Sequence, residues 1–319
     1  MRQVSNRLLP SVPFLIALSV TASLCQQPTD PLAEARSLLA AGKLAESETE
    51  VRGYLIASPS SAEAHYLLGY ILFREHKPKE SLAEFTDGAK YRHPHPDELK
   101  IVASDYVLLG DFGDADKWFA EVVAADPNDA DAWYLLGRAK FTETNFPMAI
   151  SSFEHAVALR PKYVEAENNL GLAWQESNNS DKAELAFLNA IEWQGDAPVD
   201  AQPFLNLGAL LVEQNDLDKA FFYLTKAVEM APDNPSIHEK LSKAYAARQN
   251  LPKAQSELER AVALAPDTSS LHFKLGQIYR KEGLSERANA EFDICTKLSG
   301  THSSDKTPNP LSLGNNEDR

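Results

Sequence analysis

The stretch that decides the fold is ADAWYLLGRAKFTETNFPMAISSFEHAVALRPKY, residues 130–163. In its second half the small Ala149 is followed four residues later by the bulky Phe153, and then by the small Ala156. These three positions lie along one face of a helix. The small Gly137 in the first half gives a second helix room to approach that face. A proline near the end stops the second helix, so the stretch predicts a helical hairpin.

The same pattern recurs with a period of 34 residues. Gly69 and Gly137 are 68 residues apart, twice the period, and Gly137 and Gly171 are 34 apart. From Gly171 to Gly208 the spacing is 37, and the three extra residues fall in the turn-rich stretch 194–200. A 34-residue hairpin is shorter than the roughly 40 residues that a domain needs to fold unaided, so the units must stack.

A bulky position in each unit is expected to fill the space between neighbouring hairpins, while the small positions form the close contacts. The bulky residues are Val51, Phe85, Phe119, Phe153, Phe187, Leu224, Leu258 and Phe292.

This repeat resembles the tetratricopeptide repeat (TPR) family, whose pattern runs W-x2-L-G-x2-Y, then A-x3-F, then P. Trp133, Leu136 and Gly137 carry the first part of it, with Lys140 in the place of its tyrosine. The resemblance implies an all-α, right-handed superhelical solenoid of about eight helix-turn-helix hairpins over residues 28–302. The expected units are 28–61, 62–95, 96–129, 130–163, 164–200, 201–234, 235–268 and 269–302.

Both ends of the chain are expected to lie outside the solenoid. Residues 1–25 combine a basic start with an apolar run from Val12 to Leu24. This run is shorter than the about 20 residues that a membrane-spanning helix needs, and it is typical of a signal peptide. At the other end, the polar composition of residues 303–319 predicts a disordered tail.

The N-terminal segment leaves several interpretations open. Cleavage after Ala22 or after Cys25 satisfies the small-residue rule for signal peptides. Lipidation of Cys25 is a less favoured alternative, since Leu24 is larger than the residue that usually precedes a lipidated cysteine. The sequence therefore predicts an exported protein, periplasmic or secreted. A retained apolar segment in a cytoplasmic protein is the remaining alternative.

Composition and motifs argue against several functions. The net charge of -15 disfavours binding to nucleic acid, because phosphate groups repel an acidic chain. The sequence contains no glycine-rich phosphate loop, HExxH or GxSxG motif, so we predict neither an enzyme nor a cofactor site. No metal site is predicted either. His65, His238 and His272 occupy the position of Trp133 and are expected to be packing residues, and Cys295 is expected to be a small buried residue.

The resemblance also implies a concave groove lined by the first helix of each hairpin. Its predicted character changes along the array, with aromatic residues first, amides in the middle and basic residues last. The net charge is -18 over residues 26–234 and +2 over residues 235–302. The candidate peptide-binding residues are Tyr66, Tyr70, Tyr134, Arg138, Asn169, Asn206, Lys240, Lys243, Lys274 and Arg280.

The sequence thus predicts a protein–protein interaction scaffold that binds a peptide or protein segment. A basic end favours an acidic segment or a C-terminal carboxylate as partner. Two alternatives stay open. The lysines are solubilising in one of them. In the other, the array is a structural or self-associating part of a cell-envelope assembly. The Lys and Asn set by which some TPR proteins clamp chaperone C-termini is incomplete here, since Leu172 and Ser236 occupy two of its positions.

Overall fold

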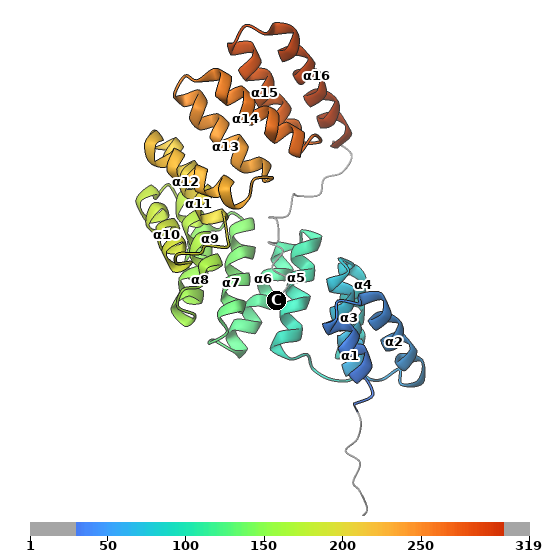
Figure 1. The fold of residues 1–319 in the computed structure, drawn as a ribbon. Helices are drawn as coiled ribbons and strands as arrows, with labels where there is room; N and C mark the ends of the chain where they lie inside the picture. Colours follow the sequence, from blue (N-terminus) through green and yellow to red (C-terminus); the bar gives the residue numbers. More distant parts are fainter. Residues whose placement is uncertain (1–29, 303–319) are drawn as a thin grey trace, which may run out of the picture.

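The protein is a curved array of helices (Figure 1). The computed structural model describes residues 30–302, with side chains described up to residue 299, and this range contains sixteen helices and no strand. Successive helices pack as eight pairs, and each pair packs on the next. The predicted all-α superhelical solenoid is confirmed. The helices are α1 Ala33–Ala40, α2 Leu44–Ala57, α3 Ala62–Arg74, α4 Pro78–Ala89, α5 Pro96–Leu109, α6 Phe112–Ala125, α7 Ala130–Thr142, α8 Phe146–Leu159, α9 Val164–Glu176, α10 Ser180–Trp193, α11 Gln202–Glu213, α12 Leu217–Met230, α13 Pro235–Ala247, α14 Leu251–Leu264, α15 Ser269–Lys281 and α16 Ser285–His302.

The expected signal peptide, Cys25 and the expected tail 303–319 lie outside the described residues. Within residues 30–302, no helix has the length and apolar character needed to cross a membrane.

Each expected unit contains one helix pair, and the three-residue insertion lies in the loop between α10 and α11. The Gln194 side chain closes this loop. Its Oε1 accepts hydrogen bonds from the backbone N–H groups of Val199 and Asp200, at 3.0 Å and 2.8 Å. A surface loop held in this way absorbs extra residues without disturbing the stacking on either side.

The reversal between the two helices of a pair has the same geometry in all eight pairs. Two residues before the second helix, the backbone enters the left-handed region with φ between +58° and +80°. In five pairs, an Asp or Asn follows at once, and its side chain accepts a hydrogen bond from the first turn of the second helix. The left-handed residues are Gly42, His76, Gly110, Thr144, Asn178, Asn215, Gln249 and Gly283.

The bulky position packs inside its own pair as well as in the expected space between neighbouring hairpins. A Cβ added to Gly137 would lie 2.6 Å from the Phe153 ring, so the ring occupies the space that the glycine leaves empty. Phe153 also belongs to a buried cluster with Leu170 and Ala173 of the next pair. The same contact of a glycine with a ring occurs in the second, fourth, fifth and eighth pairs, where it sets the distance between the two helices, and the Phe153 ring also joins its pair to the next.

We expect Gly171→Ala to lower the free energy of unfolding by about 1–3 kcal/mol, the range for overpacking a core. The new Cβ would lie 2.5 Å from the Phe187 ring, which is fully buried and has little freedom to shift. Urea denaturation followed by helical circular dichroism measures the change. Gly53→Ala is the matched control, because its added Cβ meets no atom within 4 Å. Equal stability of the two variants would contradict the packing described here.

The last pair differs from the others because, within residues 30–302, no further pair covers it. Phe292 and Cys295 on α16 are only partly buried, whereas the equivalent Phe153 and Ala156 are buried. The expectation that Cys295 is buried is therefore wrong, and the missing neighbour is the physical reason.

Candidate functional site

A cavity of about 1000 Å³ lies along the first helices of the second, third and fourth pairs, and we call it the α3–α5–α7 cavity. The cavity is largely apolar because α5 presents Ile101, Val107 and Leu108 at helical spacing. Neighbouring α3 and α7 bring aromatic and aliphatic side chains to the same space. The apolar lining includes Tyr70, Phe73, Ile101, Val107, Leu108 and Leu135.

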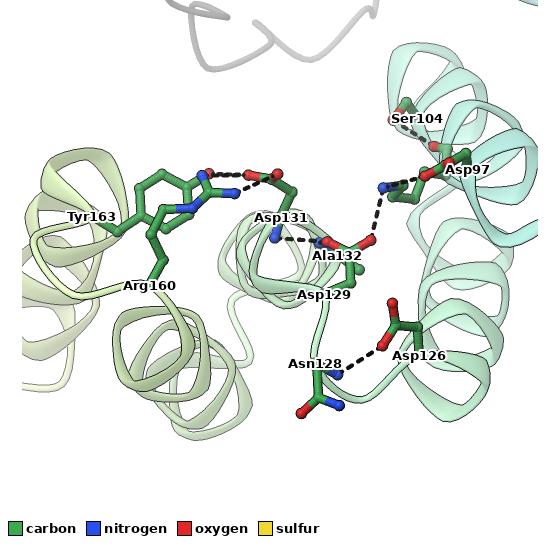
Figure 2. Close-up of polar contacts among 10 residues, drawn as sticks. Asp97, Ser104, Asp126, Asn128, Asp129, Asp131, Ala132, Arg160 and Tyr163 are labelled. Atoms are coloured by element: carbon green, nitrogen blue, oxygen red, sulfur yellow. Dashed lines mark hydrogen bonds and ion pairs between the residues drawn. The ribbon is translucent and has the colours of Figure 1, made fainter.

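Lys100 connects α5 to the start of α7 at the cavity's edge. Its Nζ lies 2.7 Å from Asp129 Oδ2 and 2.7 Å from Asp97 Oδ1 (Figure 2). Burial opposes the charge on Lys100, but the hydrogen bonds to both carboxylates outweigh it and raise the pKa of the lysine. Asp129 also caps α7, accepting from the backbone N–H groups of Asp131 and Ala132. The ion pair between Lys100 and Asp129 thus fixes α7 against α5 at the edge of the cavity.

Asp131 joins the same helix to the loop between α8 and α9. Arg160 donates to both of its carboxylate oxygens, at 2.8 Å and 2.7 Å, and the Tyr163 hydroxyl donates to Oδ1 at 2.8 Å (Figure 2). The hydrogen bond from Arg160 is the main reason why the pKa of Asp131 is lowered. Figure 2 shows both networks meeting at the N-terminal end of α7, so the position of α7 is fixed from two sides.

Arg138 lines the cavity, and its positive charge is not paired with a carboxylate of the described residues. Its guanidinium lies 5.6 Å from the Tyr134 ring centroid, and among the described residues it has no carboxylate partner. The other cations lining the cavity are ion-paired, as Arg36–Glu63, Arg92–Glu98 and Lys100–Asp129.

Three of the candidate residues from the sequence line this cavity, namely Tyr66, Tyr70 and Arg138. Tyr66 is nearly fully buried, and its hydroxyl donates to the backbone carbonyl of Arg92, so it contributes shape more than a free polar group.

The candidates at the centre of the array contact one another and their neighbours. Asn169 Nδ2 donates to the Tyr134 hydroxyl at 3.1 Å, and burial raises the pKa of this tyrosine. Asn206 Nδ2 donates to Asn168 Oδ1 at 2.9 Å. These amides form a polar ladder between successive first helices, outside the lining of the cavity.

The basic candidates at the far end are engaged with acidic neighbours. Lys240 and Lys274 share Glu239, at 3.6 Å and 2.7 Å, and Lys243 lies 3.4 Å from Glu213. These lysines compensate local acidic charge. Arg280 instead lies over the Phe292 ring, 5.6 Å from its centroid.

Sequence reasoning did not name the α5 residues among the candidates. Ile101, Ser104 and Leu108 occupy groove positions of the third unit, as Tyr70 does in the second. The repeat frame could have found them, but the third unit lacks the aromatic residues that drew attention to its neighbours.

Profiles of the tetratricopeptide repeat family match three parts of the chain, which together exceed half of it. The matched residues are 32–95 with 103–143, 130–163, and 211–288.

The curated relatives are much longer proteins. The chain is 26% identical over 181 residues to protein O-mannosyl-transferase TMTC1 of Homo sapiens, covering 55% of this chain and 20% of the relative. It is 30% identical over 113 residues to a BBSome complex member BBS4 homolog of Drosophila melanogaster, covering 35% of this chain and 23% of the relative. The chain thus spans about a fifth of the length of these relatives.

Two solved structures share the fold. A chain of the APC/C hetero-tetramer Cut9–Hcn1 superposes with a TM-score of 0.61 at 16% identity, covering 84% of this chain and 52% of that chain. A tetratricopeptide repeat protein from Parabacteroides merdae also gives 0.61, at 17% identity, covering 82% of this chain and 96% of that chain. With eight helix pairs, the glycine–ring packing and these matches together, the chain belongs to the tetratricopeptide repeat family.

Proposed function

We propose that this protein is a binding scaffold that holds a peptide segment of a partner protein in the α3–α5–α7 cavity. The observation that carries the proposal is an apolar cavity of about 1000 Å³ whose wall contains Arg138, a cation without a carboxylate partner among the described residues. Ligand sites are mostly apolar hollows with a few polar groups that fix orientation. The expected segment places apolar side chains against Ile101 and Leu108 and a carboxylate on Arg138, which suits arginine's paired donors.

The relatives support a scaffold role without naming this chain's partner. The BBS4 homolog of Drosophila melanogaster is named as a member of the BBSome complex. TMTC1 is named as a transferase, but the chain spans only 20% of it, and we propose no catalytic activity here. We also propose that the protein is exported, on the basis of the apolar run Val12–Leu24, and N-terminal sequencing of the mature chain tests this.

A random peptide library screened against the purified full chain tests the binding role. We expect enriched peptides to combine aromatic or aliphatic residues with an acidic residue or a free C-terminus. Arg138→Glu and Leu108→Asp should each weaken their binding by about tenfold or more, the effect of losing about 1.4 kcal/mol. Fluorescence polarisation with the enriched peptides measures the dissociation constants.

Two control variants locate the site. Leu185→Asp, at an exposed position on α10, should leave peptide binding unchanged. Lys274→Glu tests the basic end predicted from the sequence. Loss of binding in Lys274→Glu with normal binding in Arg138→Glu would place the site at the far end. A library that yields no enriched peptide would refute the proposal.

A further inference from the structure

A buried carboxyl lies between the second and third helix pairs. Asp105 of α5 is fully buried, and its Oδ2 lies 2.5 Å from the hydroxyl of Ser81 on α4. Its Oδ1 has no hydrogen-bond partner among the described residues. Since α4 ends the second pair and α5 begins the third, this contact spans two successive pairs. We call the contact of α3–α4 with α5 the Asp105 junction.

The other pairs have an apolar residue where the third pair has Asp105. Six of them hold a buried apolar side chain at this repeat position, namely Ile71, Ala139, Ala173, Leu210, Ala244 and Ile278. A buried apolar side chain supports the stacking of helices at any pH, whereas a carboxyl without a charged partner is tolerated there only in its neutral form. The stacking of the third pair on the second therefore depends on the protonation of one side chain.

The contacts of Asp105 favour the neutral acid. The Ser81 hydroxyl donates to the Gly69 carbonyl at 2.8 Å, as Ser47 donates to the Ala35 carbonyl at the same place in the first pair. A hydroxyl has one hydrogen and a carbonyl oxygen can only accept, so Ser81 has no hydrogen left for a carboxylate. Burial raises the pKa of Asp105 to about 7, against a smaller opposing effect of Ser81.

No charged neighbour offsets this burial. The helices α3, α4, α6 and α7 pack against α5. Among the described residues, no charged group of these helices contributes to the pKa of Asp105. Titratable groups of these helices contact one another or the backbone instead, in the sets His65–Glu84, Tyr66–Arg92 carbonyl and Asp116–Lys140.

The apolar contact at the Asp105 junction is small. Tyr66 and Phe85 of the second pair meet Val102 of the third pair in a cluster of three buried residues. The cluster that runs through the third pair into the fourth contains nine. Because less buried apolar surface holds the Asp105 junction closed, an unsolvated charge within it has a larger effect there than it would have at the next junction.

The α3–α5–α7 cavity is built across this junction, because α3 lies on one side of it and α5 and α7 lie on the other. We propose that Asp105 is a proton-dependent hinge group, which keeps the second pair packed on the third while its carboxyl is neutral and loosens the junction when the carboxyl ionises. One consequence rests on the proposed function: a peptide that contacts both α3 and α5 should hold the junction closed.

The direction with pH follows from the linkage between protonation and opening. A carboxyl whose pKa is raised in the closed junction keeps its proton there after the open form has released it, from about pH 4 upward. Opening should therefore become more favourable by up to about tenfold for each pH unit between about pH 4 and about pH 7. Above that range both forms are ionised, and the opening equilibrium stops changing.

Native-state amide hydrogen exchange of the full chain at pH 5, 6, 7 and 8, with rates corrected for intrinsic chemistry, tests the hinge without any ligand. Opening separates the first two pairs from the rest, so protection in α1–α4 should fall by about tenfold or more between pH 5 and pH 7 and then level off. Protection in α9–α12 should change less. The carboxyl-carbon chemical shift of Asp105 on the same protein should show ionisation near the pH at which the fall levels off.

Non-ionisable variants separate the hinge from other effects of pH. Asp105→Asn keeps the shape and a donor for Ser81, and Asp105→Ala introduces the residue found in three other pairs. In both variants, protection in α1–α4 should no longer fall between pH 5 and pH 7. Glu167→Gln is the matched control, because Glu167 is a buried carboxyl that contacts Asn189 of its own pair, and the fall should persist in it.

Three results would overturn the proposal. Protection in α1–α4 could stay constant while Asp105 ionises, the fall could persist in both Asp105 variants, or Asp105 could ionise near pH 4 in the folded chain.

A peptide from the library screen distinguishes failure of this inference from failure of the proposed function. At a free concentration of about 100 times its dissociation constant, the peptide should raise protection in α1–α4 by up to about a hundredfold at pH 7. A peptide that binds without raising this protection would show that its site does not bridge the junction. A screen without any binder would refute the proposed function and leave the result of the exchange experiment standing.

Discussion

Replacing Phe153 with alanine should lower the free energy of unfolding by about 3–5 kcal/mol, the range for truncating a buried aromatic ring. Phe153 is 1% exposed and fills the space above Gly137. The variant would leave a hole that the glycine cannot fill, and it would remove the ring from the cluster it shares with Leu170 and Ala173. Urea denaturation followed by circular dichroism at the helical minimum measures the loss.

A truncation on the surface calibrates this measurement. Leu185 is 60% exposed, so Leu185→Ala should change stability by no more than about 0.5 kcal/mol. A loss below about 1 kcal/mol for Phe153→Ala would mean that the repeat frame does not describe the packing.

Replacing Asp105 with alanine should stabilise the protein by about 2–4 kcal/mol at pH 8. The estimate follows because each unit by which folding raises the pKa of a carboxyl lowers the stability of the folded state by about 1.4 kcal/mol at alkaline pH. Asp105 is fully buried on α5, and its Oδ1 has no hydrogen-bond partner among the described residues. Burial raises the pKa of this carboxyl from 3.8 to about 7, against a smaller opposing effect of Ser81. Ala139, Ala173 and Ala244 occupy the equivalent position in other pairs, so alanine fits it.

The hydrogen bonding of Ser81 supports a protonated Asp105. The Ser81 hydroxyl lies 2.8 Å from the Gly69 oxygen and 2.5 Å from Asp105 Oδ2, but it has one hydrogen to donate. If Ser81 donates that hydrogen to the Gly69 carbonyl, its contact with Asp105 can be a hydrogen bond only when Asp105 is protonated. The carboxylic acid then donates its own hydrogen to the Ser81 oxygen.

The stabilisation by Asp105→Ala should therefore depend on pH. An acid whose pKa is raised on folding is favoured in its neutral form. Between about pH 4 and about pH 7, Asp105 has released its proton in the unfolded chain but keeps it in the folded chain. The natural chain therefore loses stability as pH rises through this range. The advantage of the alanine variant should grow across this window and then level off.

Thermal melts at pH 4, 6 and 8 measure this dependence, and Asp105→Asn controls for loss of the titrating group alone. If the natural chain were as stable as the alanine variant at pH 8, the carboxyl would not be the buried acid described here.

The fold could be predicted from the sequence because the repeat is read from side-chain size alone. Gly137, Ala149 and Phe153 recur in fixed phase, and size decides how closely two helices approach. The left-handed residue before each second helix was not predictable in the same way. Glycine occupies this position in three pairs, but His76, Thr144 and Gln249 occupy it in others. The left-handed backbone conformation is therefore imposed by the hairpin reversal and not by the residue type.

The site was less accessible to sequence reasoning. Counting charge placed a binding end at Lys240 and Lys274, but both lysines share Glu239, and composition does not show such pairings. The histidines at positions 65, 238 and 272 do pack, as expected. Their contacts with a glutamate 19 residues away and with a proline carbonyl six residues before could not be predicted, because only the folded chain brings these groups together.

The pairing of each bulky ring with the glycine or other small residue of its own hairpin has a consequence for how such a chain changes length. Excision or duplication of one complete 34-residue unit would separate no ring from its small partner. An excision that begins half a unit later would separate one bulky residue from the small residue against which it packs. A loop between pairs absorbs a few extra residues, as the loop between α10 and α11 does, but we expect helices to be gained or lost without loss of packing only as whole hairpins.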